Sequence, residues 1–165
     1  MPEAAPHPSP FNSALETGLR SLAILAEACP DRFDLQRLLY FDYLVVHSSD
    51  ADGPASLHPS TPLRNGELLV RRGLIERGLL LFISRDLIER SASGSGISYL
   101  AAEAAGPFLE CLGSAYSCAL RERASWAMGK FGALDDDELK SFFDARFERW
   151  TREFQAVQLP PELVL

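Results

Sequence analysis

The sequence predicts a mostly helical α+β protein with a winged helix-turn-helix core and a C-terminal pair of helices. Two apolar helical segments, divided at Arg77-Gly78, precede two short β-compatible segments at 87–90 and 97–100. The small polar residues 91–96 supply the positive-φ positions that a tight reversal between strands needs. Another helix begins near Pro107, so the order helix, helix, hairpin, helix is that of a winged helix. The predicted division is a flexible arm at 1–11, the winged-helix core at 12–105 and the helical pair at 106–158.

Capping signals place the first two helices. Ser13 followed by Glu16 has the spacing of a capping box and starts the first helix. Asp31 or Asp34 caps the next helix, which extends from Leu35 to about His47. This second helix is apolar around most of its circumference, and we therefore expect it to be buried on more than one side.

A loop of about 16 residues, 47–62, follows the second helix and is long for a compact domain. It contains His47 and His58, with Asp50 and Asp52 between them. This spacing matches no familiar set of metal ligands, so we expect the histidines to make hydrogen bonds within an ordered loop. A Ser-His-Asp hydrolase is no better supported, because nothing resembles a nucleophile elbow or an oxyanion hole. The sequence predicts no catalytic, metal or cofactor site.

The helical segment from about Arg64 carries three further arginines. Arg71 and Arg72 are expected to point mostly outward, joined by Arg77 at a helical spacing. They form either a phosphate-contacting patch or a solvated helix face, and the sequence leaves both open. The segment just before the hairpin, residues 78–86, would read DNA in a nucleic-acid-binding winged helix. It offers one serine and one arginine on an otherwise apolar surface, which argues against base reading through it.

Composition restricts the function further. The net charge is −7 and the pI is near 5.0, which disfavours general attraction to phosphate backbones. Residues 63–90, with six positive and four negative groups, are the one basic section. The three cysteines are expected to be buried free thiols, with residues 111 and 118 on one helix. No secretory signal and no membrane-spanning apolar run are found, so the sequence predicts a cytoplasmic protein.

The C-terminal part is predicted to be a helical pair. Pro107 lies in the first turn of a helix expected to continue to about Phe131. The acidic run 135–138 has approximately capping-box spacing, which favours a helix start over a metal site. The last helix carries six large apolar side chains, Phe143 and Trp150 among them. One face of a small monomer rarely covers so many, so some are expected to meet a partner.

Three stretches carry a resemblance to a known family: FDYLVVHSSD, SLHPSTPLRNGELLVRRGLIERGLLLFISRDLIE and GISYLAAEAAGPFLECL. The chain resembles, from about Ser13 to Phe154, the middle component of bacterial ABC-three-component antiphage defence systems of the Lamassu type. The resemblance implies a non-enzymatic adaptor that docks an ABC ATPase like those of structural-maintenance-of-chromosomes (SMC) complexes and an effector, often a nuclease. It also implies similarity to the winged-helix accessory subunits of condensin-like complexes.

The family offers no catalytic residues. From the residues themselves we expect no cofactor and no membrane partner. The net charge of −7 and the apolar segment before the hairpin predict only weak or indirect contact with DNA. The alternative from another class is a winged-helix transcriptional regulator that binds DNA, with an enzyme as a distant third. The candidate partner interface combines the family's polar positions with two residues of the last helix: His47, His58, Arg64, Glu67, Arg71, Arg72, Phe143 and Trp150.

Overall fold

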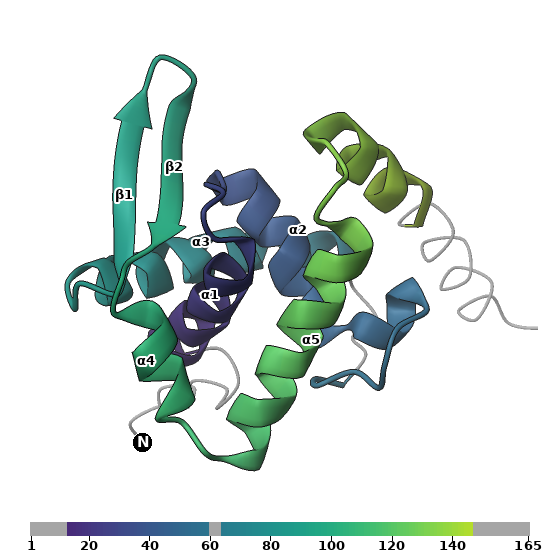
Figure 1. The fold of residues 1–165 in the computed structure, drawn as a ribbon. Coiled ribbons are helices and arrows are strands. Elements are labelled where there is room, and N and C mark those ends of the chain that lie inside the picture. The colour runs from purple at the N-terminus through teal and green to yellow at the C-terminus, as the bar shows by residue number, and fades with distance from the viewer. Residues whose placement is uncertain (1–12, 60–63, 147–165) are drawn as a thin grey trace, which may run out of the picture.

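The computed structural model describes residues 13–59 and 64–146, and it is the mostly helical α+β fold that the sequence predicts (Figure 1). Several helices surround a central one, and a two-stranded hairpin projects from the helical body. The elements are, in chain order, α1 (Ala14–Ala28), α2 (Leu35–Val46), η1 (Ser48–Ala51), α3 (Arg64–Ile83), β1 (Ile88–Ser93), β2 (Gly96–Ala101), α4 (Ala105–Glu110) and α5 (Ala115–Phe131), followed by a helix over residues 136–146.

The crossing of α1 and α3 is the most extensive packing between two helices. Gly18 of α1 and Gly78 of α3 meet there, and a Cβ on Gly78 would lie 2.5 Å from the Gly18 nitrogen. The predicted helix break at Arg77-Gly78 is therefore wrong, because α3 continues through both residues to Ile83. The glycine permits a close approach of two backbones instead of ending a helix.

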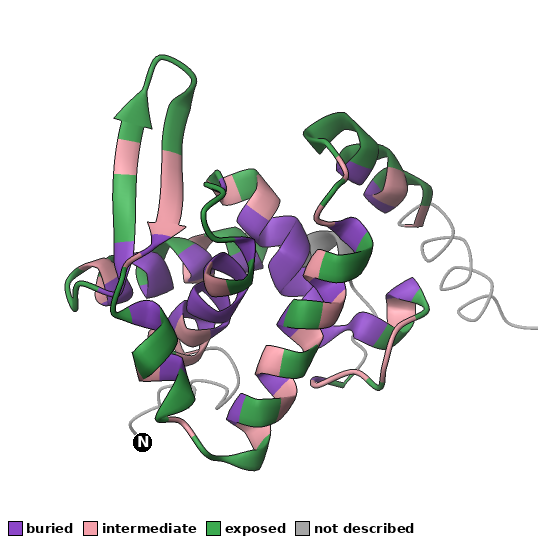
Figure 2. Cartoon of the chain, viewed as in Figure 1, coloured by how far each residue is buried: buried purple, intermediate pink, exposed green. Residues whose placement is uncertain are grey.

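The helix α2 lies at the centre of the molecule and is buried on nearly every side, as predicted (Figure 2). Asp34 is its N-cap, since its carboxylate accepts a hydrogen bond from the Arg37 amide at 2.8 Å. Ser13 caps α1 in the same way, accepting from the Glu16 amide at 3.2 Å. Both predicted helix starts are thus confirmed. The sequence offered Asp31 or Asp34 as the cap of the second helix, and the cap is Asp34.

The predicted hairpin is confirmed, with strands longer than expected. Its antiparallel register pairs Ile88 with Ala101 and Ser93 with Gly96, whose φ of 114° suits glycine. Tyr99 of β2 also forms a bridge with Phe33, the residue between α1 and α2. The strands extend into the serine- and glycine-rich patch because cross-strand hydrogen bonds stabilise residues that have little intrinsic strand preference.

The predicted single helix from Pro107 to Phe131 is wrong, because the chain forms α4 and α5 with a break between them. Ser114 caps α5 by accepting from the Ser117 amide at 3.1 Å, which starts a new helix in a new direction. The helix over residues 136–146 begins with a reciprocal capping box, in which Asp135 and Glu138 each bond the other's amide at 2.8 Å. The capping interpretation of the acidic run is therefore confirmed.

One hydrophobic cluster joins the helices of both predicted units. Phe143, from the last described helix, stacks on Tyr40 of α2 with ring centroids 4.5 Å apart and meets Tyr43 edge-on at 5.8 Å. The boundary predicted near residue 105 stays a prediction, and the predicted arm at 1–11 lies outside the described residues.

The prediction of buried cysteines is wrong, because Cys29, Cys111 and Cys118 are all exposed. Cys111 follows α4 and Cys118 lies on α5, so the two do not share a helix as predicted. Each occupies a solvent-facing position of its segment. Within the described ranges, no helix combines the length and the apolar character that crossing a membrane requires.

Candidate functional site

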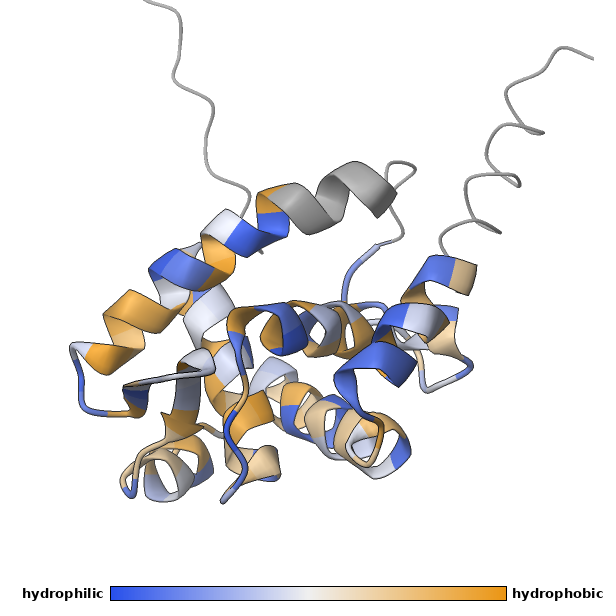
Figure 3. Cartoon of the chain, turned by 90° about the horizontal axis from the view of Figure 1, so that it is seen from above, coloured by the Kyte–Doolittle hydropathy of each residue, from blue (hydrophilic) through white to orange (hydrophobic). Residues whose placement is uncertain are grey.

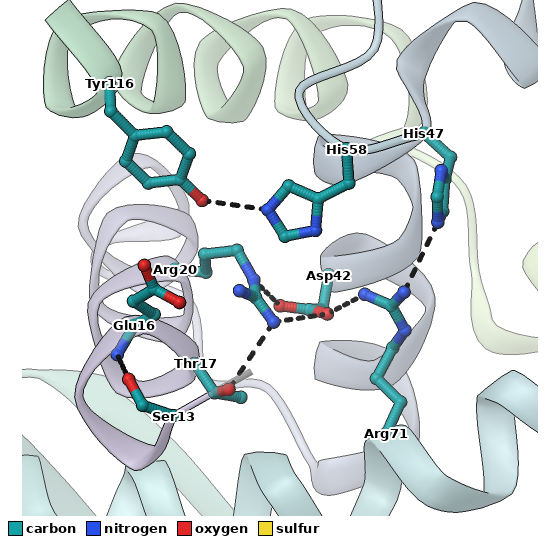
Figure 4. Close-up of polar contacts among 9 residues, drawn as sticks. All are labelled: Ser13, Glu16, Thr17, Arg20, Asp42, His47, His58, Arg71 and Tyr116. Carbon is teal, nitrogen blue, oxygen red and sulfur yellow. Dashed lines mark hydrogen bonds and ion pairs between the residues drawn. The ribbon is translucent and has the colours of Figure 1, made fainter. Parts of the chain in front are cut away.

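Two buried arginines from different helices converge on one buried carboxylate, that of Asp42 on α2 (Figure 4). Arg20 of α1 donates to it through Nε at 2.8 Å, and Arg71 of α3 donates through NH1 at 2.5 Å. Asp42 and Arg20 are completely inaccessible to solvent, and Arg71 is 5% exposed. One carboxylate therefore links three helices at their common centre.

Charge keeps this carboxylate ionised. Burial alone would raise the pKa of Asp42, but the charges and hydrogen bonds of Arg20 and Arg71 outweigh burial and lower it to about 2. The Asp42 carboxylate in turn raises the pKa of Arg20 against the opposing effect of burial. Asp42 and Arg20 are therefore both charged across the physiological pH range. We call Asp42, Arg20 and Arg71 the Asp42 hub.

Both histidines of the long loop lie next to the hub. His47, the C-cap of α2, places Nε2 3.4 Å from NH2 of Arg71. His58 places Nε2 3.1 Å from the hydroxyl of Tyr116 on α5. Burial, followed by the positive charge of Arg20, lowers the pKa of His58 to about 4. His58 is consequently neutral at pH 7, and its hydrogen bond with Tyr116 agrees with the ordered loop that was predicted.

Two cations of α5 hold the same loop by hydrogen bonds to its backbone. Arg123 donates twice to the Ala55 carbonyl, at 2.9 and 3.1 Å, and Lys130 donates to the Ala51 carbonyl at 2.7 Å. Gly53 lies against Trp126, where a Cβ would come within 2.2 Å of the indole ring. The described part of the loop, residues 47–59, is therefore an ordered structural element. Its backbone carbonyls accept the hydrogen bonds that attach it to α5.

The described loop residues, 47–59, hold no group of side chains arranged for a metal ion. Within residues 13–59 and 64–146, no three His, Cys, Asp or Glu side chains lie together as a metal would require. The hydroxyls of Ser49 and Ser56 approach each other at 2.5 Å, so each serine contacts the other. The charged residues of the Asp42 hub contact one another as well. This geometry suits a structural role, in which buried charges define how helices pack.

The predicted interface residues separate into three groups: buried, exposed, and outside the described residues. His47, His58, Arg71 and Phe143 are buried, so a docking partner does not reach their side chains in this conformation, and the prediction that Arg71 points outward is wrong. Arg71 turns inward because Asp42 provides a buried counter-charge. Arg72 is exposed. Trp150 and the side chains of Arg64 and Glu67 lie outside the described residues, and the role of all eight in an interface stays a prediction.

A different surface of α3 carries features that the sequence did not reveal. Val70 and Leu80 are 68% and 64% exposed, the two highest values among the large apolar side chains of the described residues. With Gly73 and Arg77 they recur at spacings of three and four residues, so all four lie along one stripe of the helix. We call this stripe, together with the exposed residues Arg72 and Glu76 at its side, the α3 outer face.

This face is not apparent from the sequence, because apolar residues in a helix before a hairpin are usually buried. The only available signal was that Val70 and Leu80 fall on the same side as Arg77. A side that mixes leucine, valine and arginine fits a surface that is exposed in the isolated chain and apolar enough to bind protein.

The chain matches a known protein family. A family model described as the ABC-three component (ABC-3C) system Middle Component 2 matches residues 10–153. The chain belongs to this family. The match covers most of the sequence, from before α1 to beyond the last described helix. No curated protein and no solved structure matches the chain.

Membership of the Middle Component 2 family confirms the resemblance to a middle component of an ABC-three-component system. A middle component is by its description one part of a multi-component ABC-3C system, so the chain works with other subunits. This assignment indicates a component of a defence system. Surfaces for other proteins are therefore the features of the fold to examine first.

Proposed function

We propose that this chain is a non-enzymatic adaptor of an antiphage defence complex of the Lamassu type, acting in the cytoplasm. In this proposal it links an SMC-like ABC ATPase to an effector subunit that is a nuclease. Its membership of the Middle Component 2 family supports the proposal, because a middle component has other subunits to join. The observation that carries the proposal is the α3 outer face, where Val70 and Leu80, the two most exposed large apolar side chains of the described residues, lie on one stripe of the helix.

The element order supports a winged-helix core for this adaptor. In a winged helix, a short β segment between the first two helices pairs with the last strand of the hairpin. Here Phe33 lies between α1 and α2, and its amide and carbonyl bond those of Tyr99 at 3.0 and 2.8 Å. The helix α3 would then correspond to the recognition helix of DNA-binding relatives of this fold. Its outer face suits a protein surface better than the edges of bases.

The state of the titratable groups supports a role without catalysis. A general base or nucleophile must reach a substrate while keeping a reactive protonation state. Asp42 is buried and ion-paired with two arginines, and His58 is neutral and hydrogen-bonded to Tyr116. These groups support the packing of the helices, so we infer that the chemistry of the complex belongs to its other subunits.

A DNA-binding regulator is the second candidate, favoured by the exposed Arg72 and Arg77 beside a hairpin. The net charge of −7 and the exposed Val70 and Leu80 count against it. The purified chain should bind duplex DNA weakly, without sequence preference, and with an affinity that falls steeply as salt rises. Tight, sequence-selective binding at about 150 mM salt would favour the regulator instead.

Co-purification tests the adaptor directly. The full chain, carrying an affinity tag, is expressed with the ATPase and the effector of its own system, and the three are isolated through the tag. We expect both partners to be retained, and an ATPase–effector pair expressed without the chain to separate. Retention of neither partner by the folded chain would contradict the proposal.

A further inference from the structure

The α3 outer face has no partner among the described residues. In Figure 3 the helix lies along one margin of the molecule, with hydrophobic and hydrophilic residues alternating along its length. The opposite side of α3, with Ile75, Gly78 and Phe82 buried, packs on the rest of the protein. From Val70 to Leu80 the exposed stripe spans about 15 Å, or roughly three helical turns.

Gly73, at the middle of this face, has no explanation within the fold. A Cβ built on it would meet nothing within 4 Å, so no neighbouring element requires a glycine there. A glycine inside a helix costs backbone entropy compared with alanine. Gly18 and Gly78 show in this same protein what a helical glycine permits, which is the close approach of another helix. Gly73 offers the same opportunity on the outside.

The charge of the α3 outer face limits the kinds of partner that it could bind. Arg72 makes no ion pair within the described residues, and Arg77 contacts only the carbonyl of Gly73, at 3.3 Å. With Glu76 the face is net positive on a chain of net charge −7. A second copy would place two positive faces against each other, and nucleic acid would leave the apolar side chains unused. A partner that satisfies both features is apolar along one side and acidic at its edges.

We propose that the α3 outer face binds an amphipathic helix of a partner protein. The apolar stripe of that helix packs on Val70 and Leu80 and crosses closely at Gly73. Carboxylates beside the stripe pair with Arg72 and Arg77. This is helix-to-helix recognition by residues spaced three, four and seven apart. The inference deepens the proposed adaptor function and rests on it for the identity of the partner, but its first test does not depend on the other subunits.

The first test uses a synthetic helical peptide of about 18 residues, with leucines along one side and glutamates beside them. The full ¹⁵N-labelled chain is titrated with this peptide and with a twin in which lysine replaces each glutamate. We expect saturable shifts of the amides between Val70 and Leu80, and at least tenfold weaker binding of the lysine twin. Leu80→Glu should weaken binding at least tenfold, while Leu15→Glu, on α1 at a similar exposure of 62%, should not. The inference would be overturned by an absence of shifts on α3 or by equal binding of the two peptides. It would also be overturned if the wild-type chain were a dimer that Leu80→Glu dissociates.

The second test uses Gly73→Leu in the co-purification experiment. The fold has open space at this position, so the unfolding temperature should not fall, whereas a leucine would keep a partner helix at a distance. We expect Gly73→Leu and Leu80→Glu to lose one partner and keep the other, and Leu15→Glu to keep both. If the wild-type chain and both face variants retain the partners equally, the inference about the α3 outer face is wrong. The proposed adaptor function is then still supported. If the wild type retains neither while the peptide result holds, the adaptor is wrong and the face remains a site for acidic helices.

Discussion

Replacing Asp42 with asparagine should destabilise the protein severely. The amide keeps the shape of the side chain but removes the negative charge that Arg20 and Arg71 share in the interior. Breaking a buried ion pair by removing one partner typically costs about 3–5 kcal/mol, because the remaining charge stays desolvated. The total stability of a domain is about 5–15 kcal/mol, so the loss is a large fraction of it.

Urea unfolding followed by circular dichroism measures this loss. In thermal unfolding, the same loss should lower the unfolding temperature of a chain of this size by about 6–20 °C. The matched control is Asp144→Asn, which breaks the exposed ion pair with Lys140 and should change stability little, because solvent screens an exposed pair. A cost for Asp42→Asn within about 1 kcal/mol of the control would refute the argument that the buried charges specify the packing.

The pH dependence of stability follows from the same carboxylate. The folded pKa of Asp42, about 2, lies below its ordinary value of 3.8. The unfolded chain therefore takes up a proton first as pH falls, and this contribution is present above pH 3.8 and lost between 3.8 and about 2. The shift corresponds to about 2 kcal/mol. Asp42→Asn should remove this segment of the pH–stability curve, and an unchanged curve below pH 4 would contradict the shift.

Three other substitutions should change stability in a definite direction. His58→Phe should flatten the stability curve between pH 6.5 and 4, because the lowered pKa of His58 makes the wild type lose stability as pH falls through that window; urea unfolding at pH 7 and pH 4.5 measures the difference. Gly78→Ala should destabilise by about 1–3 kcal/mol, since its methyl group would meet the α1 backbone, whereas Gly73→Ala should stabilise by up to about 1 kcal/mol. Thermal unfolding of the two alanine variants compares them, and equal effects would show that the α1–α3 crossing is not close.

Local signals in the sequence predicted where three of the helices begin. Ser13, Asp34 and the pair Asp135 and Glu138 each cap a helix where the spacing placed it, because a cap depends only on residues within one turn. The hairpin was likewise confirmed. Its turn chemistry is local, although the ends of its strands depend on cross-strand pairing.

Features that depend on distant residues were not predicted. Gly78 has the sequence signature of a helix break, and only its contact with Gly18, on another helix, shows that it serves packing. Arg71 has the signature of a solvated residue, because an isolated arginine is rarely buried. Its partners Asp42 and Arg20 come from two other helices, and no periodicity within α3 reveals them.

One sequence signal could have found the hub. Asp42 is the single charged residue within FDYLVV, a run predicted to be buried on several sides. A carboxylate in that position requires a cation from a neighbouring helix, and arginine is the residue best suited to a buried pair. The candidate cations were the arginines of the helices before and after it, which include Arg20 and Arg71.

The hub and the α3 outer face are geometrically coupled. Arg71 points inward to Asp42, and each residue turns a helix by about 100°, so Leu80, nine positions later, points about 180° away. Gly78, seven positions after Arg71, returns to the inner side and meets α1. The ion pair and the glycine crossing therefore set the rotation of α3, and that rotation is what exposes Val70 and Leu80. A variant of the hub would weaken partner binding through loss of folding, whereas Leu80→Glu would weaken it with stability unchanged, so measuring both quantities separates support of the face from contact with the partner.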